Sequence, residues 1–426
     1  MRIRCSTDTV NNHDLHFMEH ALDLARKGIG LASPNPTVGC VLVKDGAIIG
    51  DGFHQYTWRD HAEIVALKQA GEKARGATLY VTLEPCNSTG RTGPCTEAII
   101  SAGISRVVAA MEDANPKTRG SGFTRLRGAG IEVETGVLEA AAEKLNEAFT
   151  CWITTRKPLV TLKSALTLDG QLALPQQRGG KKPAWITSEE SRAEVQRMRH
   201  ASDALLTGIG TILADDPLLT DRSGLERRRR LLRVILDTRL RLSPKARIVE
   251  TADDDLLIFT AATLKSPRAR KLQEAGLELV RLETRGGKLD LHAVLRELAR
   301  REILSVLLEA GPRLNGSPER WHRPQAGPLL CAKTSRSFRR PVSLRDERRS
   351  PAPSSAFRSA VRSGRRYRSI PAKFLSALHI RQRIFCPISR FFATILHRFV
   401  LPARTQLEAL RACLTLLVPG ASVSGA

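Results

Sequence analysis

The stretch HAEIVALKQAGEKARGATLYVTLEPCNSTGRTGPCTEAII, residues 61–100, decides how this chain is interpreted. Apolar residues at helical spacing in 61–75 are followed by a β-rich run, ATLYVTLEP (77–85), and then by a second helical pattern, CTEAIISAG (95–103). Helix, strand and helix in this order are typical of an α/β unit with a covered sheet. Cys86 and Cys95 flank the loop before the second helix, so they are a ligand pair, a disulfide or two unrelated thiols.

A metal site is the interpretation that the surrounding residues favour. His61 opens the first helix, so the stretch offers one imidazole and two thiolates, and three protein ligands with an open fourth position are typical of catalytic zinc. Glu63 lies two residues after the histidine, where a carboxylate can exchange protons with water at the metal. His-x-Glu followed by Pro-Cys and a second Cys is the order of zinc deaminases, here with eight residues between the cysteines. A disulfide or a chance pair remains the alternative.

The same alternation of helices and strands continues through the chain and predicts a second α/β region. In the first region we expect a helix at 14–27, two short strands around the Asp45–Gly46 turn and strands at 104–113 and 130–138, in a mostly parallel sheet. In the second region we expect strands at 158–165, 203–208, 231–237, 256–260, 277–282 and 303–311, and helices at 188–200, 264–275 and 289–301. The boundary between the two regions is expected near 150–156.

Length, charge and cysteine content narrow the class of protein. A chain of 426 residues is long enough for two or three domains. The net charge of +24 is concentrated in 317–426, which holds 21 Lys and Arg against 4 Asp and Glu, so the preceding residues have an ordinary balance. We recognise no export signal in the sequence and no apolar run of the ~18 residues that are needed to span a bilayer. Eight scattered cysteines favour a reducing, cytoplasmic location.

The residues after Gly316 differ in character from the rest. They are rich in Arg, Ser and Pro and show neither strand nor helix periodicity, so most of 317–426 is expected to be disordered. We therefore expect three parts: 1–153, 154–316 and the basic tail 317–426. A tail of this charge would suit RNA or acidic partners, but it lacks aromatic interleaving and any recognisable binding module, so nucleic acid is not expected as a partner.

Several long motifs resemble a known family. SPNPTVGCVLV, GFHQYTWRDHAE, LYVTLEPCNSTGRTGPCTEAI and GISRVVAAMEDANPKTRGSG are similar to bifunctional riboflavin-biosynthesis proteins of the RibD type, and the similarity extends over about 14–316. It implies a cytidine-deaminase-like α/β/α sandwich followed by a dihydrofolate-reductase-like α/β domain. It also implies one zinc ion per chain on His61, Cys86 and Cys95, with Glu63 as the proton shuttle. The resemblance further implies that Asn35 and His54 contact the substrate and that Arg91 contacts its ribose phosphate.

The second region carries the reductase motifs of that family, LVTLKSALTLDGQLAL, the long stretch WITSEESRAEVQRMRHASDALLTGIGTILADDPLLTDR, and VLLEAG. From the residues alone, Gly208-Ile209-Gly210-Thr211 after a strand would let backbone amides approach a phosphate, although a plain turn is the default interpretation. A plain turn is likewise the default interpretation of Glu309-Ala310-Gly311 at the end of an apolar strand. The resemblance implies substrate contacts at Trp185, Arg199, Asp215, Arg222 and Glu309, with both arginines on the phosphate and Asp215 nearest the reacting ring. NADPH is implied near Lys163, Thr187, Gly208, Gly210, Thr211 and Gly311.

The resemblance implies two reactions on a small-molecule pyrimidine ribosyl phosphate. The first is hydrolytic deamination of a diaminopyrimidinone, and the second is NADPH-dependent reduction of the ribosyl group to ribityl phosphate. A homodimer or homotetramer is implied if the reductase part folds. The main alternatives are another zinc nucleoside or nucleotide deaminase with an unrelated second domain, and a nucleic-acid-binding protein acting through the tail.

Three departures from the family pattern qualify these expectations. Ser88 stands where a histidine is usual, and Pro183 stands where the family often has serine. After Gly316 the family's apolar helix and last strands are replaced by the basic tail, so the reductase part is expected to be incomplete. A shift of the reading frame near codon 316 would account for this change.

Overall fold

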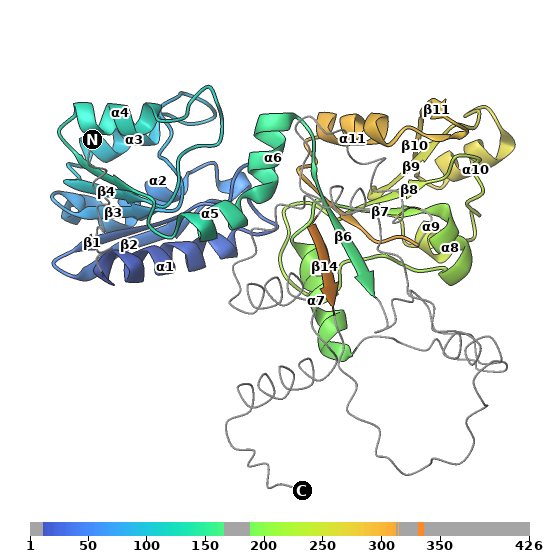
Figure 1. The fold of residues 1–426 in the computed structure, drawn as a ribbon, viewed down its shortest axis with the longest axis horizontal. Coiled ribbons are helices and arrows are strands. Elements are labelled where there is room, and N and C mark those ends of the chain that lie inside the picture. The colour runs from blue at the N-terminus through green and yellow to red at the C-terminus, as the bar shows by residue number, and fades with distance from the viewer. Residues whose placement is uncertain (1–11, 166–187, 312–313, 315–330, 336–426) are drawn as a thin grey trace, which may run out of the picture. The chain divides into compact units, whose positions relative to one another are not determined.

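The computed structural model describes residues 12–165, 188–311, 314 and 331–335, which form two large sheets flanked by helices and one small two-stranded ribbon (Figure 1). The expected site residues Trp185 and Thr187 lie outside the described residues, as do Pro183 and most of the basic tail. Within the described residues, no helix combines the length and apolar character needed to cross a membrane.

The first α/β part is a three-layer sandwich. Its elements are α1 (Asn12–Lys27), β1 (Gly39–Lys44), β2 (Ala47–Phe53), the 3-10 turn η1 (Tyr56–Trp58), α2 (Ala62–Ala70), the 3-10 turn η2 (Gly71–Ala74), β3 (Thr78–Val81), α3 (Cys95–Ser101), β4 (Arg106–Ala109), α4 (Ser121–Gly128), β5 (Glu132–Thr135), α5 (Glu139–Leu145) and α6 (Glu147–Thr155). The strand order is β2-β1-β3-β4-β5. Helices α1 and α5 lie on one side of this sheet and α2, α3 and α4 on the other (Figure 1). The expected α/β/α sandwich is confirmed.

The first sheet is mixed, so the expectation of a mostly parallel sheet is wrong for this part. β1 pairs antiparallel with both β2 and β3, and only the β3–β4 and β4–β5 pairs are parallel. The reason lies in the turn, where Asp45 (φ 52°) and Gly46 (φ 78°) both adopt left-handed conformations. A two-residue turn of this kind joins only antiparallel strands.

The second α/β part is built on a fully parallel sheet. Its elements are β6 (Leu159–Ala165), α7 (Glu189–His200), β7 (Ala204–Gly208), α8 (Ile209–Asp215), β8 (Leu232–Leu236), α9 (Arg247–Glu250), β9 (Leu256–Thr260), α10 (Pro267–Glu274), β10 (Glu278–Arg281), β11 (Thr284–Arg285), β12 (Lys288–Leu289), α11 (Leu291–Arg300), β13 (Ser305–Leu308) and β14 (Cys331–Ser335). The strand order is β10-β9-β8-β7-β13-β6-β14, and every pairing is parallel. The six strands expected here are confirmed, as are the three helices.

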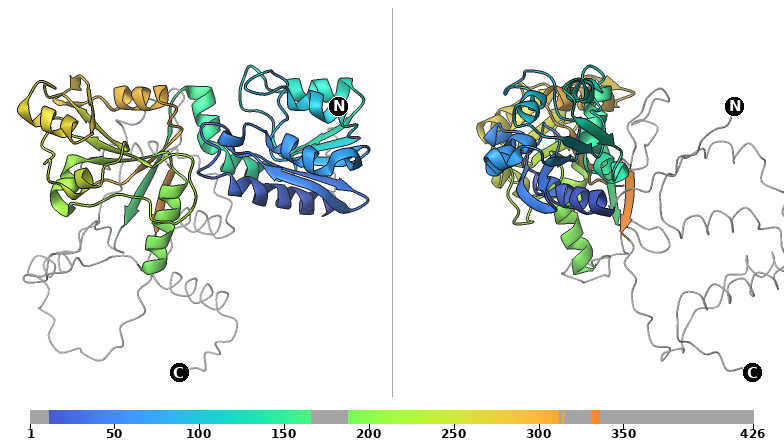
Figure 2. Two further views of the ribbon diagram at one scale, coloured as in Figure 1. Left: turned by 180° about the vertical axis from the view of Figure 1, so that it is seen from behind. Right: turned by 90° about the vertical axis from the view of Figure 1, so that its left-hand side faces the viewer.

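Alternate side chains of the central strands face two separate cores. Leu205 and Ile235 pack with the apolar residues of α8, α9 and α10. Their neighbours Leu206 and Val234 pack with Val294 and the other buried residues of α11. Because successive side chains of a strand point to opposite faces, both faces of the sheet are apolar and helices cover each of them (Figure 2).

The structure adds elements that the sequence patterns did not indicate. Helices α4, α5 and α6 lie outside the expected set, and α6 covers the expected boundary near 150–156. Strand β14 pairs with β6 although it belongs to the segment 317–426, for which mostly disordered structure is expected. The sheet of the second part therefore has one strand beyond the expected set.

A buried ion pair holds a loop of the second part. Arg233 on β8 is 1% exposed, and its Nε and Nη2 donate to the two carboxylate oxygens of Asp255 at 3.0 and 2.6 Å. The same guanidinium donates to the carbonyl oxygens of Leu218 and Thr251. It therefore ties the loop that follows α8, which carries candidate site residues, to the sheet.

This arrangement predicts an asymmetric response to mutation. The Arg233→Met variant should lower the free energy of unfolding by about 3–5 kcal/mol, because it leaves the Asp255 carboxylate buried without its cationic partner and with only the backbone N–H of Asp253 donating to it. The double variant Arg233→Met/Asp255→Leu should recover most of that loss, since neither charge is then buried. Urea unfolding of both variants and the unmodified chain measures this. A double variant as unstable as the single one would contradict it.

Candidate functional site

Three potential metal ligands from separate positions in the chain meet in the first part. His61 directly precedes α2, Cys86 lies in the loop after β3, and Cys95 is the first residue of α3. One ligand atom from each residue lies within 4.8 Å of the other two. The sequence expectation that these three side chains form a cluster agrees with this geometry.

The ligand atoms face one another. His61 Nδ1 lies 3.2 Å from Cys95 Sγ and 3.5 Å from Cys86 Sγ, so Nδ1 is the imidazole atom directed at both sulfurs. The backbone N–H of Cys95 donates to Cys86 Sγ at 3.3 Å, which directs the first turn of α3 at that sulfur. Cys40, Cys86, Cys95 and Cys151, the cysteines whose side chains the structure describes, are free thiols, so Cys86 and Cys95 do not form a disulfide there.

The electrostatics of the cluster suit a cation. A hydrogen bond from the Cys95 thiol and one from His61 lower the pKa of Cys86 to about 4, although burial raises it. The pKa of Cys95 is raised, because its thiol holds the proton donated to Cys86 and because it is buried. Hydrogen bonding to Cys86 also raises the pKa of His61. One imidazole nitrogen and two sulfurs that compete for protons are the donor set of a tetrahedral zinc site with one open position, so the residues present fit zinc.

Glu63 stands next to this cluster without belonging to it. It is the second residue of α2 and is 3% exposed. Burial raises the pKa of its carboxyl group, while the nearby His61 lowers it in part. A buried carboxyl group beside a metal ligand set is well placed to hold and pass on a proton.

Asn35 and His54 form one hydrogen-bonded unit beside the cluster. Asn35 Nδ2 donates to His54 Nε2 at 3.0 Å, and His54 Nδ1 lies 2.9 Å from the carbonyl oxygen of Asp60. Because a carbonyl oxygen only accepts, the proton is on Nδ1 and Nε2 is the acceptor. Burial lowers the pKa of His54 to about 4, so the ring is neutral near pH 7. Its centroid lies 5.3 Å from that of His61.

The loop between the cysteines is supported from both sides. Thr96 Oγ1 donates to Asn87 Oδ1 at 3.0 Å, and Asn87 Nδ2 donates to the carbonyl oxygen of Ser121 at 3.5 Å. The carboxylate of Glu84, just before the loop, accepts from three backbone N–H groups of 113–122. A side chain at Gly122 would place its Cβ 2.1 Å from the carbonyl oxygen of Pro85, so only glycine permits this approach.

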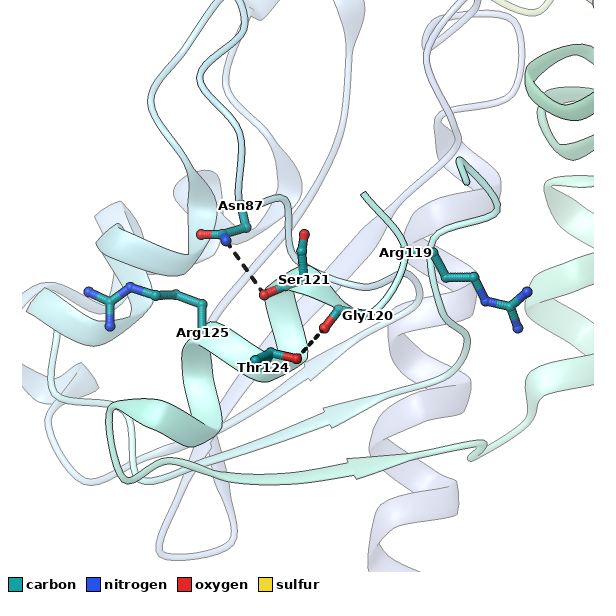
Figure 3. Close-up of a pocket in the computed structure, with 6 residues that line it drawn as sticks. All are labelled: Asn87, Arg119, Gly120, Ser121, Thr124 and Arg125. Atoms are coloured by element: carbon teal, nitrogen blue, oxygen red, sulfur yellow. Dashed lines mark hydrogen bonds between the residues drawn. The ribbon is translucent and has the colours of Figure 1, made fainter. Parts of the chain in front are cut away.

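A shallow pocket lies where the loop meets α4, and Figure 3 shows its lining residues Asn87, Arg119, Gly120, Ser121, Thr124 and Arg125. The two arginines are already neutralised, because Arg119 pairs with Glu112 and Arg125 pairs with Glu97, each at 2.7 Å. The guanidinium groups of both point away from the middle of the pocket (Figure 3). The pocket therefore supplies little free positive charge.

Arg91 and Ser88 occupy the outer part of the same loop, and both are exposed. Arg91 does not form a salt bridge with any described carboxylate; its Nη1 donates to the carbonyl oxygen of Tyr56 at 3.4 Å, and its guanidinium carbon lies 4.2 Å from the Tyr56 ring centroid. The structure thus brings all the expected residues of the first part to one region.

A second group of expected residues gathers in the second part. Arg199 donates through Nε and Nη2 to the two carboxylate oxygens of Glu309, at 2.7 and 3.1 Å, and Lys163 Nζ lies 3.9 Å from the same carboxylate. Arg199 Nη1 also donates to the carbonyl oxygen of Thr220. Lys163 is on β6, and Glu309 follows β13. The carboxyl ends of parallel strands are where α/β sheets bind ligands.

The remaining expected residues of the second part surround that edge more loosely. Asp215 is exposed at the end of α8 and has no hydrogen bond to the described residues. Arg222 is exposed, and its backbone N–H donates to Gln196 Oε1. Gly208 precedes α8, Gly210 and Thr211 are in its first turn, and Gly311 is exposed beyond β13. Trp185 and Thr187 cannot be placed because they lie outside the described residues.

The turn at Gly208 leaves room for a ligand. A Cβ at Gly210 would meet no atom within 4 Å, and one at Gly208 would meet only Leu314 Cδ2 at 3.9 Å, so the space beside this turn is open. The residues present therefore fit a large cofactor such as NADPH, whose phosphates could approach the glycine backbone closely. Thr207, the residue before the turn, is fully buried, and its hydroxyl oxygen has no hydrogen-bond partner.

Two supporting residues were not identified from the sequence. Asn146, between α5 and α6, exchanges hydrogen bonds with the backbone N–H and C=O of Thr37 at 2.8 and 3.0 Å and so fixes the segment that carries Asn35. Tyr56 contacts the guanidinium of Arg91. Only long-range contacts reveal either role, since an isolated asparagine or tyrosine carries no such signal.

Comparison with known protein families matches both parts. The model of the cytidine and deoxycytidylate deaminase zinc-binding region matches residues 11–111. The model of the RibD C-terminal domain matches residues 158–318. The second match ends close to Gly316, after which the sequence changes character.

Individual relatives extend over both matches. The chain is 45% identical over 300 residues to riboflavin biosynthesis protein RibD of Aquifex aeolicus, covering 70% of this chain and 81% of the relative. It is 42% identical over 315 residues to RibD of Escherichia coli, covering 71% of this chain and 83% of the relative.

Solved structures resemble the fold as well. RibD of Acinetobacter baumannii superposes with a TM-score of 0.63 at 37% identity, covering 77% of this chain and 92% of that one. The Thermotoga maritima diaminohydroxyphosphoribosylaminopyrimidine deaminase/5-amino-6-(5-phosphoribosylamino)uracil reductase superposes with a TM-score of 0.60 at 41% identity, covering 70% and 81% of the two chains.

The cluster predicts which thiols retain metal. Cys86→Ala and Cys95→Ala should each purify with most of their zinc lost, because two ligands hold the ion far less tightly than three. Cys151→Ala, which removes a buried free thiol outside the cluster, should keep the zinc content of the unmodified chain. Elemental analysis of the purified proteins measures this. Full zinc content in both cluster variants would show that the metal is bound elsewhere.

Proposed function

The chain belongs to the RibD family of riboflavin biosynthesis proteins, and from this membership we propose which residues carry its two activities. It is a bifunctional enzyme with a zinc-dependent deaminase part and an NADPH-dependent reductase part. The observation that carries the deaminase assignment is the convergence of one imidazole and two sulfurs beside a buried glutamate. The substrate proposed here is the small-molecule diaminopyrimidinone ribosyl phosphate named for relatives of this kind.

For the deaminase, we propose that His61, Cys86 and Cys95 hold zinc and that Glu63 moves protons. When bound, the metal lowers the pKa of water toward neutrality and so makes hydroxide available for attack on the ring carbon. Glu63, buried beside the ligands, would accept one proton from the attacking water and give it to the ring nitrogen, and would then carry the proton of the added hydroxyl group to the amine, which leaves as ammonia.

The neighbouring residues would hold the pyrimidine in place. His54 and Asn35 are already hydrogen-bonded to each other, so a substrate group that meets them finds fixed donors and acceptors. Arg91, which has no carboxylate partner among the described residues, is proposed to bind the ribosyl phosphate. Ser88 replaces the usual histidine with a shorter side chain that can still donate or accept a hydrogen bond.

For the reductase, we propose that the edge formed by Lys163, Arg199 and Glu309 binds the ribosyl phosphate substrate next to the cofactor. NADPH supplies the hydride, so the protein mainly orients the two molecules. The residues proposed to hold the cofactor are Lys163, Thr187, Gly208, Gly210, Thr211 and Gly311. Those proposed to line the substrate site are Trp185, Arg199, Asp215, Arg222 and Glu309, with Asp215 nearest the reacting ring.

The division of the chain is also a proposal. We assign 1–153 to the deaminase, 154–316 to a reductase domain that lacks its last family elements, and 317–426 to a tail unlike the family. The end of the family match at 318 and the relatives' additional length support this division. A cytoplasmic location is consistent with the free thiols, and a homodimer or homotetramer would follow the family.

Glu63→Gln tests the deaminase assignment. The variant should keep its zinc and lose ammonia release by at least 100-fold, because the amide cannot carry the proton while the metal ligands are unchanged. Ammonia release and NADPH oxidation are followed separately with diaminopyrimidinone ribosyl phosphate as substrate. Full ammonia release by Glu63→Gln would rule out the mechanism.

Removing 317–426 tests the division of the chain. Ammonia release by the shortened protein should equal that of the full chain, because every residue proposed for deamination lies before residue 317. NADPH oxidation by the same shortened protein serves as the internal comparison. The deletion removes β14, which pairs with the reductase sheet. A large loss of ammonia release would show that the tail is part of the deaminase.

A further inference from the structure

Four consecutive arginines, residues 227–230, lie in the loop before β8, and three of them have carboxylate partners. Arg227 pairs with Asp221 at 2.9 Å, Arg229 pairs with Asp203 at 3.2 Å, and Arg230 pairs with Asp253. Arg228 does not form a salt bridge with any carboxylate of the described residues. Since a charged group removed from water normally acquires a partner, Arg228 is the member of the run that needs an explanation.

Arg228 is held firmly by its surroundings. Arg227 Nη1 and Nη2 donate to the carbonyl oxygens of Arg199, His200 and Ser202, and Arg229 Nη2 donates to that of Glu302. The loop is therefore anchored on both sides of Arg228. The backbone N–H of Arg228 donates to the carbonyl oxygen of Gly30 at 2.9 Å, and thus reaches a residue of the deaminase part.

The side chain of Arg228 meets the deaminase at Tyr56. Its guanidinium carbon lies 4.3 Å from the Tyr56 ring centroid, and that of Arg91 lies 4.2 Å from the same centroid. Two guanidinium groups, one from each part of the chain, are therefore gathered around one aromatic ring. Neither has a carboxylate partner among the described residues, and Arg228 Nε is buried without any hydrogen-bond partner.

Cation–π contact explains why each arginine lies on the ring, but it offers no acceptor to the remaining N–H donors of the two guanidinium groups. Burial and the neighbouring Arg229 lower the pKa of Arg228, while the carboxylates of Asp203 and Glu302 raise it in part. An anion reaching both guanidinium groups would balance their charge and accept from the free N–H donors. A phosphate group has the charge and the several acceptor oxygens that two arginines require.

The position of this pair relative to the zinc ligands suggests which phosphate it binds. Arg91 belongs to the loop between Cys86 and Cys95, and Tyr56 lies two residues after His54, whose ring centroid is 5.3 Å from that of His61. The paired cations therefore lie beside the residues proposed for the deaminase. The other candidate of this type, the pocket with Arg119 and Arg125, has its charges neutralised by Glu112 and Glu97.

We propose that Arg228, from the reductase part, binds the ribosyl phosphate of the deaminase substrate together with Arg91, and that Tyr56 holds the two guanidinium groups in place. The deaminase site would then be built from both parts of the chain. This inference rests on the proposed deaminase function for the identity of the phosphate-bearing substrate.

The test compares two arginines of the same run in the full-length chain. Arg228→Gln should raise the KM for the diaminopyrimidinone ribosyl phosphate at least tenfold, with kcat within a factor of two, because a charged hydrogen bond to the phosphate is lost. Arg230→Gln removes the same charge from an exposed side chain paired with Asp253 and should leave both values unchanged. Arg228→Lys, which keeps the charge, should recover part of the loss.

The dephosphorylated ribosyl substrate separates phosphate binding from a structural role. With this substrate, Arg228→Gln and the unmodified chain should have the same KM. An equal loss with both substrates, or no loss with either, would overturn the proposal. Zinc content and thermal unfolding of each variant establish that the comparison is made between folded proteins.

Calorimetric titration with ribose 5-phosphate makes the test independent of turnover. The unmodified chain should bind this probe at least tenfold more tightly than Arg228→Gln does, and Arg230→Gln should match the unmodified chain. Equal binding by the two Arg228 proteins, or no binding by the unmodified chain, would refute the phosphate site. Binding that depends on Arg228 in a protein that releases no ammonia would leave the phosphate site standing and refute the deaminase function.

Discussion

The convergence of His61 Nδ1 with two cysteine sulfurs is the constraint on which the first part of the structure depends. The three atoms lie within 4.8 Å of one another although the residues belong to separate segments. Such a cluster forms only if α2, the end of β3 and the start of α3 are fixed relative to one another. The mixed sheet does this, because β3 lies beside the β1–β2 hairpin and α2 and α3 lie on the same side of it (Figure 1). The loop between the cysteines is then restrained through Asn87, which bonds to Thr96 and to the carbonyl oxygen of Ser121.

Much of this fold could be predicted from the sequence because apolar periodicity reports burial directly. The parallel strands of the second part were recognisable as short apolar runs, as expected for strands covered on both faces. Helices α4 and α5 were missed for a local reason. Each starts after a residue in the left-handed conformation, Gly120 and Leu138, and neither has a side-chain cap. The usual start signals are therefore absent, although the residues of α5, EAAAEKL, are strong helix formers by themselves.

The metal ligands and the arginine contacts differ in how far the sequence reveals them. His61, Cys86 and Cys95 were predictable because each residue type and its spacing already match the chemistry of zinc. A run of four arginines, in contrast, is typical of a solvated surface, and it does not indicate which member lacks a partner. That information depends on Asp203, Asp221 and Asp253, which are distributed over 50 residues of sequence and come together only in the fold.

Neutralisation of charge distinguishes supporting residues from candidate ligand contacts in both parts. Arg233 is buried, but Asp255 balances its charge, and so it acts as an anchor for a loop. Arg199 is balanced by Glu309, and the pair forms a fixed part of the edge that is proposed to bind the reductase substrate. Arg91 and Arg228 instead share one aromatic ring and have no carboxylate among the described residues. Arg228 is partly buried, where an unpaired charge is unfavourable unless function requires it, and the exposed Arg91 lies on the same ring, so an anion that the protein binds best explains the pair.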